Sequence, residues 1–200
     1  MEYNNLNSFQ LDALKEVSNI GAGNSATALS VLLDTKIDMT IPNLNLIEFN
    51  KLLMNYKENT VVAVLVKVLD DIEGSVLYIF EEEVALKIIS KLTLKEEHIL
   101  DGMGKSVIGE IGNIIASSFM NAIADFTKLK ATASVPAVVN DMLSAILSSA
   151  FLETGQYEDY VLDIETLFKG EGENDDIQGH FYFVPAPGSL EKVLEALGMK

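Results

Sequence analysis

The sequence predicts an α/β fold made of two homologous halves that meet about a pseudo-two-fold axis, with antiparallel strands flanked by long helices. Three observations predict it: an internal repeat, a long amphipathic helix at the start of each half, and strand-like runs later in each half. The chain has 200 residues, of which 48% are hydrophobic and 22% are charged. A chain of this size and composition can bury a core, so we expect a single domain over residues 1–200.

The internal repeat appears when the sequence is compared with itself at an offset of 94 residues. The aligned pairs are Asp12 with Ser106, Glu16 with Glu110, Asn19 with Asn113, and Pro42 with Pro136. Later in the chain, the stretch that starts at Ile72 resembles the stretch that starts at Ile177, which is an offset of 105 residues. The larger offset predicts an insertion in the second half, at about residues 140–159. The two repeats then cover about 8–92 and 103–197.

Each half opens with a long helix, predicted at about 8–33 and about 103–127, because apolar residues recur with helical periodicity. The aligned acidic residues and asparagine of the first helix fall within about 60° of arc, opposite Leu14 and Val17. The second helix repeats this arrangement, with Ile111 on its apolar side. We therefore expect each helix to bury one face and to offer a carboxylate and a carboxamide to solvent.

Shorter elements follow each long helix. Extended pieces are expected at Ile37–Ile41 and Ala131–Val135. Runs of β-branched and aromatic residues predict two strands in each half, at Thr60–Leu69 and Ser75–Phe80, and at Tyr160–Phe168 and His180–Val184. A closing helix is expected at Glu83–Leu92 and at Ser189–Leu197. One extra helix, Asp141–Leu152, is predicted inside the insertion.

Composition excludes several classes of protein. The chain has no cysteine, which excludes disulfides, thiol catalysis and cysteine metal sites. All 14 basic residues are lysine and 30 residues are acidic, giving a net charge of −16 that argues against nucleic-acid binding. The lack of arginine removes the bidentate group that most proteins use to hold phosphate. The only histidines, His98 and His180, lack metal-ligand spacing, so we expect no metal site of the protein's own.

The sequence shows no targeting or membrane signal. Residues Met1–Asn5 lack the basic and apolar regions of a signal peptide. The longest fully apolar run, Val61–Val66, is far too short to span a membrane. We therefore expect a soluble, cytoplasmic protein.

The repeated Glu-x-x-Asn pattern is weak evidence for a function when taken alone, because surface helices commonly carry glutamate. Asparagine is less usual there, because it is a weaker helix former than alanine by about 0.5 kcal/mol and favours helix caps. Here it stands in mid-helix twice, as Asn19 and Asn113. Descent from one ancestral repeat would also preserve the match, so the pattern leaves both interpretations open.

The two motif copies together resemble the paired signature of the CheC/CheX/FliY family of phosphatases. The first copy is Asp12-x-x-x-Glu16-x-x-Asn19 followed by 22 residues and Pro42, and the second is Ser106-x-x-x-Glu110-x-x-Asn113 followed by 22 residues and Pro136. The stretch Asn19-Ile-Gly-Ala-Gly-Asn-Ser is similar to the first helix of the CheC type. The likeness covers essentially the whole chain, whereas CheX-like members have one such site and FliY-like members append a flagellar-motor domain.

The resemblance implies a CheC-like fold and a chemotaxis phosphatase that hydrolyses the phospho-aspartate of a CheY-type response regulator in two-component signalling. It implies that Asn19 and Asn113 position the attacking water, and that Glu16 and Glu110 dock against a lysine of the regulator. The regulator would bring its own Mg²⁺, so no cofactor is expected in this chain. A partner that supplies the positive charge would explain how an acidic, arginine-free protein handles phosphate.

The resemblance also implies binding of CheD, the receptor deamidase. We expect the predicted inserted helix, with Asp141, Met142 and Ile146, to form the surface for this partner, because methionine and exposed apolar residues are typical of interfaces. The alternative is that these apolar residues belong to the core.

Two other functions compete with the phosphatase. A non-catalytic chemotaxis or flagellar-switch scaffold that binds CheD or CheY would not depend on the asparagines. A conventional hydrolase would use Asp12 and Glu16 as acid and base, but Ser106 in the second copy counts against it. Gly21-Ala-Gly23 fits a loose dinucleotide pattern but follows a helical stretch, so close helix packing is the better interpretation of these small residues.

Overall fold

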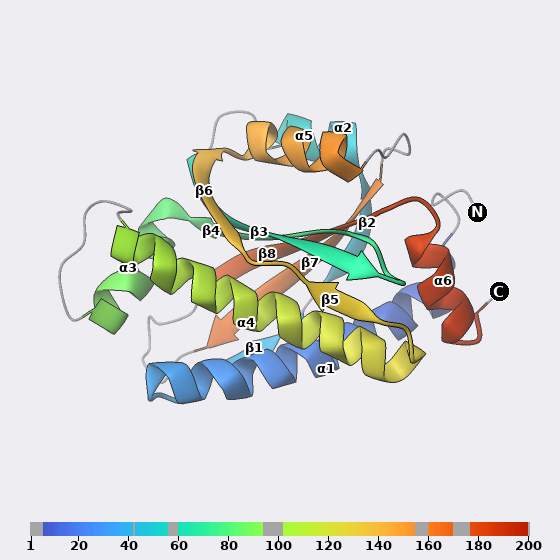
Figure 1. Ribbon diagram of the computed structural model, residues 1–200, viewed down its shortest axis with the longest axis horizontal. Helices are drawn as coiled ribbons and strands as arrows, with labels where there is room; N and C mark the ends of the chain where they lie inside the picture. The colour runs from blue at the N-terminus through green and yellow to red at the C-terminus, as the bar shows by residue number, and fades with distance from the viewer. Residues whose placement is uncertain are drawn as a thin grey trace.

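The computed structural model describes residues 6–41, 43–55, 60–93, 102–154, 160–169 and 177–199 (Figure 1). Both halves have the same element order, α-β-β-α-β-β-α. The first half contains α1 (Ser8–Leu33), β1 (Asp38–Thr40), β2 (Leu44–Glu48), α2 (Phe49–Asn55), β3 (Thr60–Asp70), β4 (Gly74–Glu81) and α3 (Glu82–Thr93). The second half contains α4 (Gly102–Thr127), β5 (Ala131–Ala133), β6 (Ala137–Met142), α5 (Leu143–Thr154), β7 (Tyr160–Lys169), β8 (Ile177–Pro185) and α6 (Ser189–Ala196).

The two halves share one sheet and exchange their edge strands. All pairings are antiparallel, and the order is β1-β7-β8-β4-β3-β5, with β2 also on β7 and β6 also on β3. The first half thus supplies the edge beside the second half's β7, and the second half supplies the edge beside β3. The equivalent strands β4 and β8 pair with each other at the centre. This arrangement confirms the predicted halves with antiparallel strands.

Each edge is a strand broken at one place. The register advances four residues from Thr40 to Leu44 on one edge while the partner β7 advances three, from Leu167 to Ile164. The other edge does the same between β5 and β6, opposite β3. Pro136 lies in that second break, which suits a residue that cannot donate to a strand ladder. Pro42 lies outside the described residues.

Helices cover both faces of the sheet, as Figure 1 shows, with α2 and α5 on one side and α1 and α4 on the other. Alternate residues of each strand therefore enter two different cores. Val62, Val64 and Val66 of β3 belong to the larger core under α1 and α4, whereas Val61 and Ala63 belong to the smaller core under α2 and α5. This two-sided burial explains why β3 reads as a continuous apolar run.

The helices α1 and α4 lie antiparallel beside each other, as Figure 1 shows. The start of α1 is fixed by a capping box, in which the Asn7 side chain accepts from the Gln10 backbone N–H and the Gln10 side chain accepts from the Asn7 backbone N–H. The two helices approach closely at Gly21, where an added Cβ would lie 2.9 Å from the Phe119 Cα. The packing role predicted for the small residues is therefore right for Gly21. It is wrong for Gly23, which is exposed with nothing within 4 Å of an added Cβ.

Among the described residues, α4 alone is long and apolar enough to cross a membrane by length and composition. Half of its qualifying stretch is buried inside the protein. Ile108, Ile115 and Phe119 of α4 lie in the larger core, so this helix is a core helix of the fold.

The structure corrects the predicted insertion. Asp141 and Met142 are not helical but end strand β6, and the helix begins at Leu143. This helix, α5, is not an extra element, because α2 is its shorter counterpart in the first half. Counterpart elements start 94 residues apart at Phe49 and Leu143, 100 at Thr60 and Tyr160, 103 at Gly74 and Ile177, and 107 at Glu82 and Ser189. The additional residues are therefore spread over three places, and only some fall in 140–159.

His180 on β8 forms the one described pair of a histidine with a carboxylate. Its Nδ1 lies 3.3 Å from Oδ1 of Asp163 on β7, and its ring stacks on Tyr182. The bond to Asp163 raises the pKa of His180, with smaller contributions from Glu165 and Glu81, while burial opposes the shift. The pair lies on the sheet face opposite α1 and α4, so it serves the fold rather than the predicted site.

We predict opposite stability effects for alanine at two neighbouring glycines. Gly21→Ala should lower the free energy of unfolding by about 1–3 kcal/mol, because its Cβ meets the Phe119 backbone. Gly23→Ala should raise it by about 0.5–1 kcal/mol, because alanine is the better helix former at an open position. Urea denaturation of both variants measures the difference. Equal stability of the two would contradict the close approach of α1 and α4.

The His180 pair predicts how stability changes with pH. Because the folded pKa lies above the unfolded value of about 6.5, the pair stabilises fully below that pH and loses its effect as pH rises through the raised pKa. Asp163→Asn should flatten this part of the curve, and the His180 pKa followed by NMR should fall. An unchanged curve in that variant would refute the assignment.

Candidate functional site

The structure places both predicted motif stripes on the outer sides of α1 and α4. Asp12, Glu16 and Asn19 are all exposed, and the intervening Leu14 and Val17 are buried. On α4 the same arrangement holds: Ser106 and Glu110 are exposed and Asn113 is half-buried, while Ile108 and Ile111 are buried. Each helix therefore presents the expected carboxylate and carboxamide to solvent.

The antiparallel packing separates the two stripes. Because Gly21 lies against Phe119, Asn19 is two residues from this contact in one direction and Asn113 is six residues from it in the other. At about 1.5 Å per residue the two asparagines are about 12 Å apart along the helix axes. They therefore belong to two separate stripes.

The motif side chains are not engaged within the described part of the chain. No hydrogen bond or ion pair to a described residue involves the side chains of Glu16, Asn19, Glu110 or Asn113. Ser106 differs, because its hydroxyl donates to the carbonyl of Gly102 at 2.9 Å. The carboxylates and carboxamides are thus available to groups from outside the molecule.

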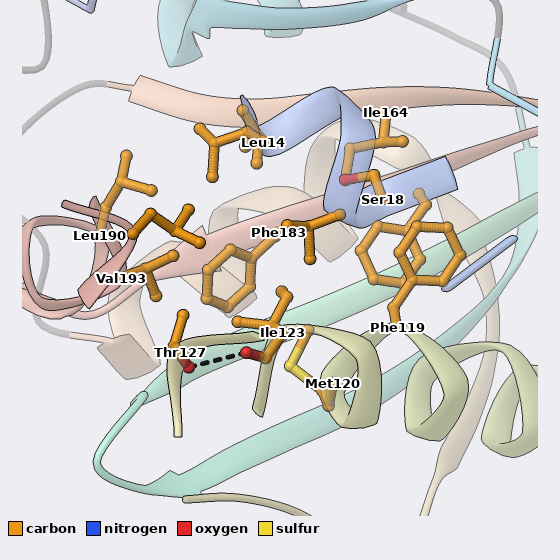
Figure 2. Close-up of a pocket in the computed structure, with 14 residues that line it drawn as sticks. Leu14, Ser18, Phe119, Met120, Ile123, Thr127, Ile164, Phe183, Leu190 and Val193 are labelled. Carbon is orange, nitrogen blue, oxygen red and sulfur yellow. Dashed lines mark hydrogen bonds between the residues drawn. The ribbon is translucent and has the colours of Figure 1, made fainter. Parts of the chain in front are cut away.

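A small apolar cavity of about 20 Å³ lies behind the first stripe (Figure 2). It is lined by Leu14, Val17 and Ser18 from the inner side of α1, and by residues of α4, α6, β7 and β8. Figure 2 shows no hydrogen bond between the Ser18 hydroxyl and the other lining residues, whereas the Thr127 hydroxyl donates to the Ile123 carbonyl at 2.7 Å. Among the described residues, no acidic or basic side chain lines this cavity.

The inner side of α4 behind the second stripe is packed more closely than that of α1. An added Cβ at Gly112 would lie 2.5 Å from the Val64 Cβ, so α4 is pressed against β3 one residue before Asn113. The equivalent position in α1 is Ser18, which lines the cavity. Sequence reasoning did not single out Gly112. A signal existed, because glycine inside a helix costs about 1 kcal/mol and usually has a packing reason.

Pro136 and two of the predicted partner residues, Asp141 and Met142, lie on or next to strand β6, whereas Pro42 lies outside the described residues. Strand β6 packs beside the second stripe, because a Cβ added at Gly109 would lie 3.3 Å from the Val138 side chain. Asp141 and Met142 are exposed at the end of β6. Ile146 is buried in the smaller core under α5, so the prediction that it forms a partner surface is wrong.

The arrangement limits the chemistry that this surface can do alone. Among the described residues, no group of three or more histidine, aspartate and glutamate side chains is placed to hold a metal ion. Asp12 and Glu16 stand on an open helix surface, without the enclosed pocket that an independent hydrolase uses to exclude water.

Comparisons with known proteins identify the family. The CheC-like family matches residues 9–46, and the family described as chemotaxis phosphatase CheX matches residues 62–157. The CheY-P phosphatase CheC of Bacillus subtilis is 32% identical over 98% of this chain and 97% of its own length. The flagellar motor switch phosphatase FliY of the same organism is 34% identical over 61% of this chain but only 30% of its own length.

A solved structure supports the fold. Thermotoga maritima FliY matches with a TM-score of 0.81, covering 96% of this chain and 98% of that one, at 19% sequence identity. At this identity the likeness concerns the fold alone. The identity to the Bacillus subtilis CheC protein over almost the whole length of both chains is the stronger result, and it shows that this chain belongs to the CheC-like family.

Proposed function

We propose that the protein is an aspartyl-phosphate phosphatase that acts in the cytoplasm on a CheY-type response regulator. The observation that supports this best is the pair of exposed Glu/Asn stripes on two antiparallel helices, without an enclosed acid–base pocket behind them. A surface of this kind suits a substrate that is itself a protein. Its relatives named CheY-P phosphatase and flagellar motor switch phosphatase support the same reaction class.

In the proposed reaction, Asn19 or Asn113 holds a water in line with the phosphorus. A carboxamide can do this because its oxygen accepts a hydrogen bond and its nitrogen donates one. The water oxygen bonds to phosphorus while the bond from phosphorus to the aspartate oxygen breaks, which releases inorganic phosphate and a free carboxylate. The regulator brings Mg²⁺, which neutralises the phosphoryl oxygens, so this chain needs no metal of its own.

Glu16 and Glu110 are proposed to fix the regulator on the stripe through a lysine of the regulator. Each lies about one helical turn from its asparagine, on the same side of the helix. The net charge of −16 adds long-range attraction for a basic surface patch. Asp12 and Ser106, one turn further, differ in charge, so the two stripes would attract the regulator unequally.

A second proposed partner is the receptor deamidase CheD. The support is limited to Asp141 and Met142, which are exposed at the end of the edge strand β6. This edge has a free side, because β6 pairs only with β3 among the described strands.

We predict that the two asparagines act independently. Asn19→Ala should leave the turnover of the second site unchanged, and Asn113→Ala should leave the turnover of the first site unchanged. The double variant should dephosphorylate the regulator about 10²–10³ times more slowly than the wild type. Loss of phosphate from a phosphorylated CheY-like regulator, in the presence of Mg²⁺, measures each rate. Asn24→Ala is the matched control, because Asn24 is exposed on α1 but points away from the stripe. A folded double variant with wild-type activity would favour the scaffold function instead.

We predict that charge reversal weakens docking. Glu16→Lys and Glu110→Lys together should lower the affinity for the regulator about tenfold, and the wild-type affinity should fall as salt rises. Calorimetric binding at low and high salt measures both effects. Glu195→Lys on α6 is the control for the change in total charge, because Glu195 is exposed away from the stripes. If the stripe variants bind like this control, the glutamates do not dock the regulator.

A further inference from the structure

Each motif stripe begins with a large, exposed apolar side chain. Phe9 is 70% exposed and Met103 is 57% exposed, and each is the second residue of its helix. The two positions are 94 residues apart, the offset that also relates Asn19 to Asn113. At about 100° per residue, Phe9 falls on the same side of α1 as Glu16 and Asn19. The stripes therefore extend to an apolar residue at their outer ends.

The fold does not need Phe9 at this place. The helix start is held by the capping box of Asn7 and Gln10. The apolar contacts of this turn come from Leu6 and Leu11, which pack against the larger core. An exposed apolar residue is common on any protein. What is unusual is that two different residues, phenylalanine and methionine, keep a large apolar exposed side chain at matched positions beside both motifs.

A second matched pair lies at the same ends. Phe126 of α4 is 49% exposed and Leu32 of α1 is 40% exposed, again 94 residues apart. Because the helices are antiparallel, α4 ends where α1 begins (Figure 1). Phe126 therefore lies at the end that carries Phe9, and Leu32 at the end that carries Met103. At about 100° per residue, however, Phe126 and Leu32 fall on the side of their helices opposite the stripes, so only Phe9 and Met103 continue the stripes.

We propose that Phe9 and Met103 are the apolar anchors that hold the response regulator, Phe9 at the first site and Met103 at the second. This rests on the proposed function. The motif glutamates are exposed, and exposed ion pairs contribute little to affinity. Burial of large apolar side chains at the rim of each stripe supplies the missing attraction. The matching surface of the regulator is an apolar patch beside its lysine.

The test uses proteins with one working site. Phe9→Ala in the Asn113→Ala protein, which retains the first site, should raise KM about five- to thirtyfold and leave kcat unchanged. The same substitution in the Asn19→Ala protein should raise KM much less. Met103→Ala should raise KM in the Asn19→Ala protein, which retains the second site, and should raise it much less in the Asn113→Ala protein. Leu152→Ala is the control, because Leu152 is 84% exposed on α5, on the other face of the sheet.

Two outcomes would overturn the anchors: a KM for Phe9→Ala equal to that of Leu152→Ala, or an equal rise in both single-site proteins. Direct binding separates this result from a failure of the phosphatase function. The protein carrying Phe9→Ala and Met103→Ala is titrated with the regulator charged with beryllofluoride. Weaker binding than for Leu152→Ala supports the anchors even if no phosphate is released, and unchanged binding refutes them whatever the rate.

Discussion

The exchange of edge strands between the two halves is the constraint on which the rest of the structure depends. The strands β1 and β2 pair with β7 of the other half, and β5 and β6 pair with β3. Neither half can complete its own edge, so both must contribute to one sheet with β4 and β8 at its centre. The two long helices then lie antiparallel on one face, which places the two Glu/Asn stripes apart on separate helices.

Because helices cover both faces of the sheet, the side chains that could take part in a reaction lie on the outer sides of the helices. The strands carry buried apolar side chains on both faces, and the described residues that line the cavity behind α1 include no ionisable side chain. The groups that could handle a phosphoryl group stand on the outer sides of the helices, where water has free access. A rigid surface of this kind becomes useful only when another protein covers it and excludes bulk water. The regulator proposed as substrate would also bring the Mg²⁺ and the positive charge that this arginine-free chain lacks.

The internal repeat relates the two stripes, but the helix turns that carry their asparagines are packed differently against the rest of the protein. Gly112 presses α4 against Val64 directly before Asn113, whereas the equivalent Ser18 of α1 lines a cavity before Asn19. A catalytic group held by close packing loses less freedom when it binds its water. The helix turn before Asn113 is therefore more tightly packed than the turn before Asn19, and Phe9 gives the first stripe the larger exposed apolar side chain.

The sequence alone determined the long helices, the long strands and the solvent-facing motif stripes, because each follows from local periodicity. It did not determine α2, β2 or β6. A seven-residue helix is too short to show periodicity, and the strand β6 forms only because β3 pairs with it. For the same reason Asp141 and Met142 were wrongly assigned to a helix, and for Ile146 the alternative interpretation, burial in the core, is the right one. The strand exchange, the separation of Asn19 from Asn113 and the close approaches at Gly21 and Gly112 were decided by the tertiary structure alone, because contacts between distant segments leave no local pattern.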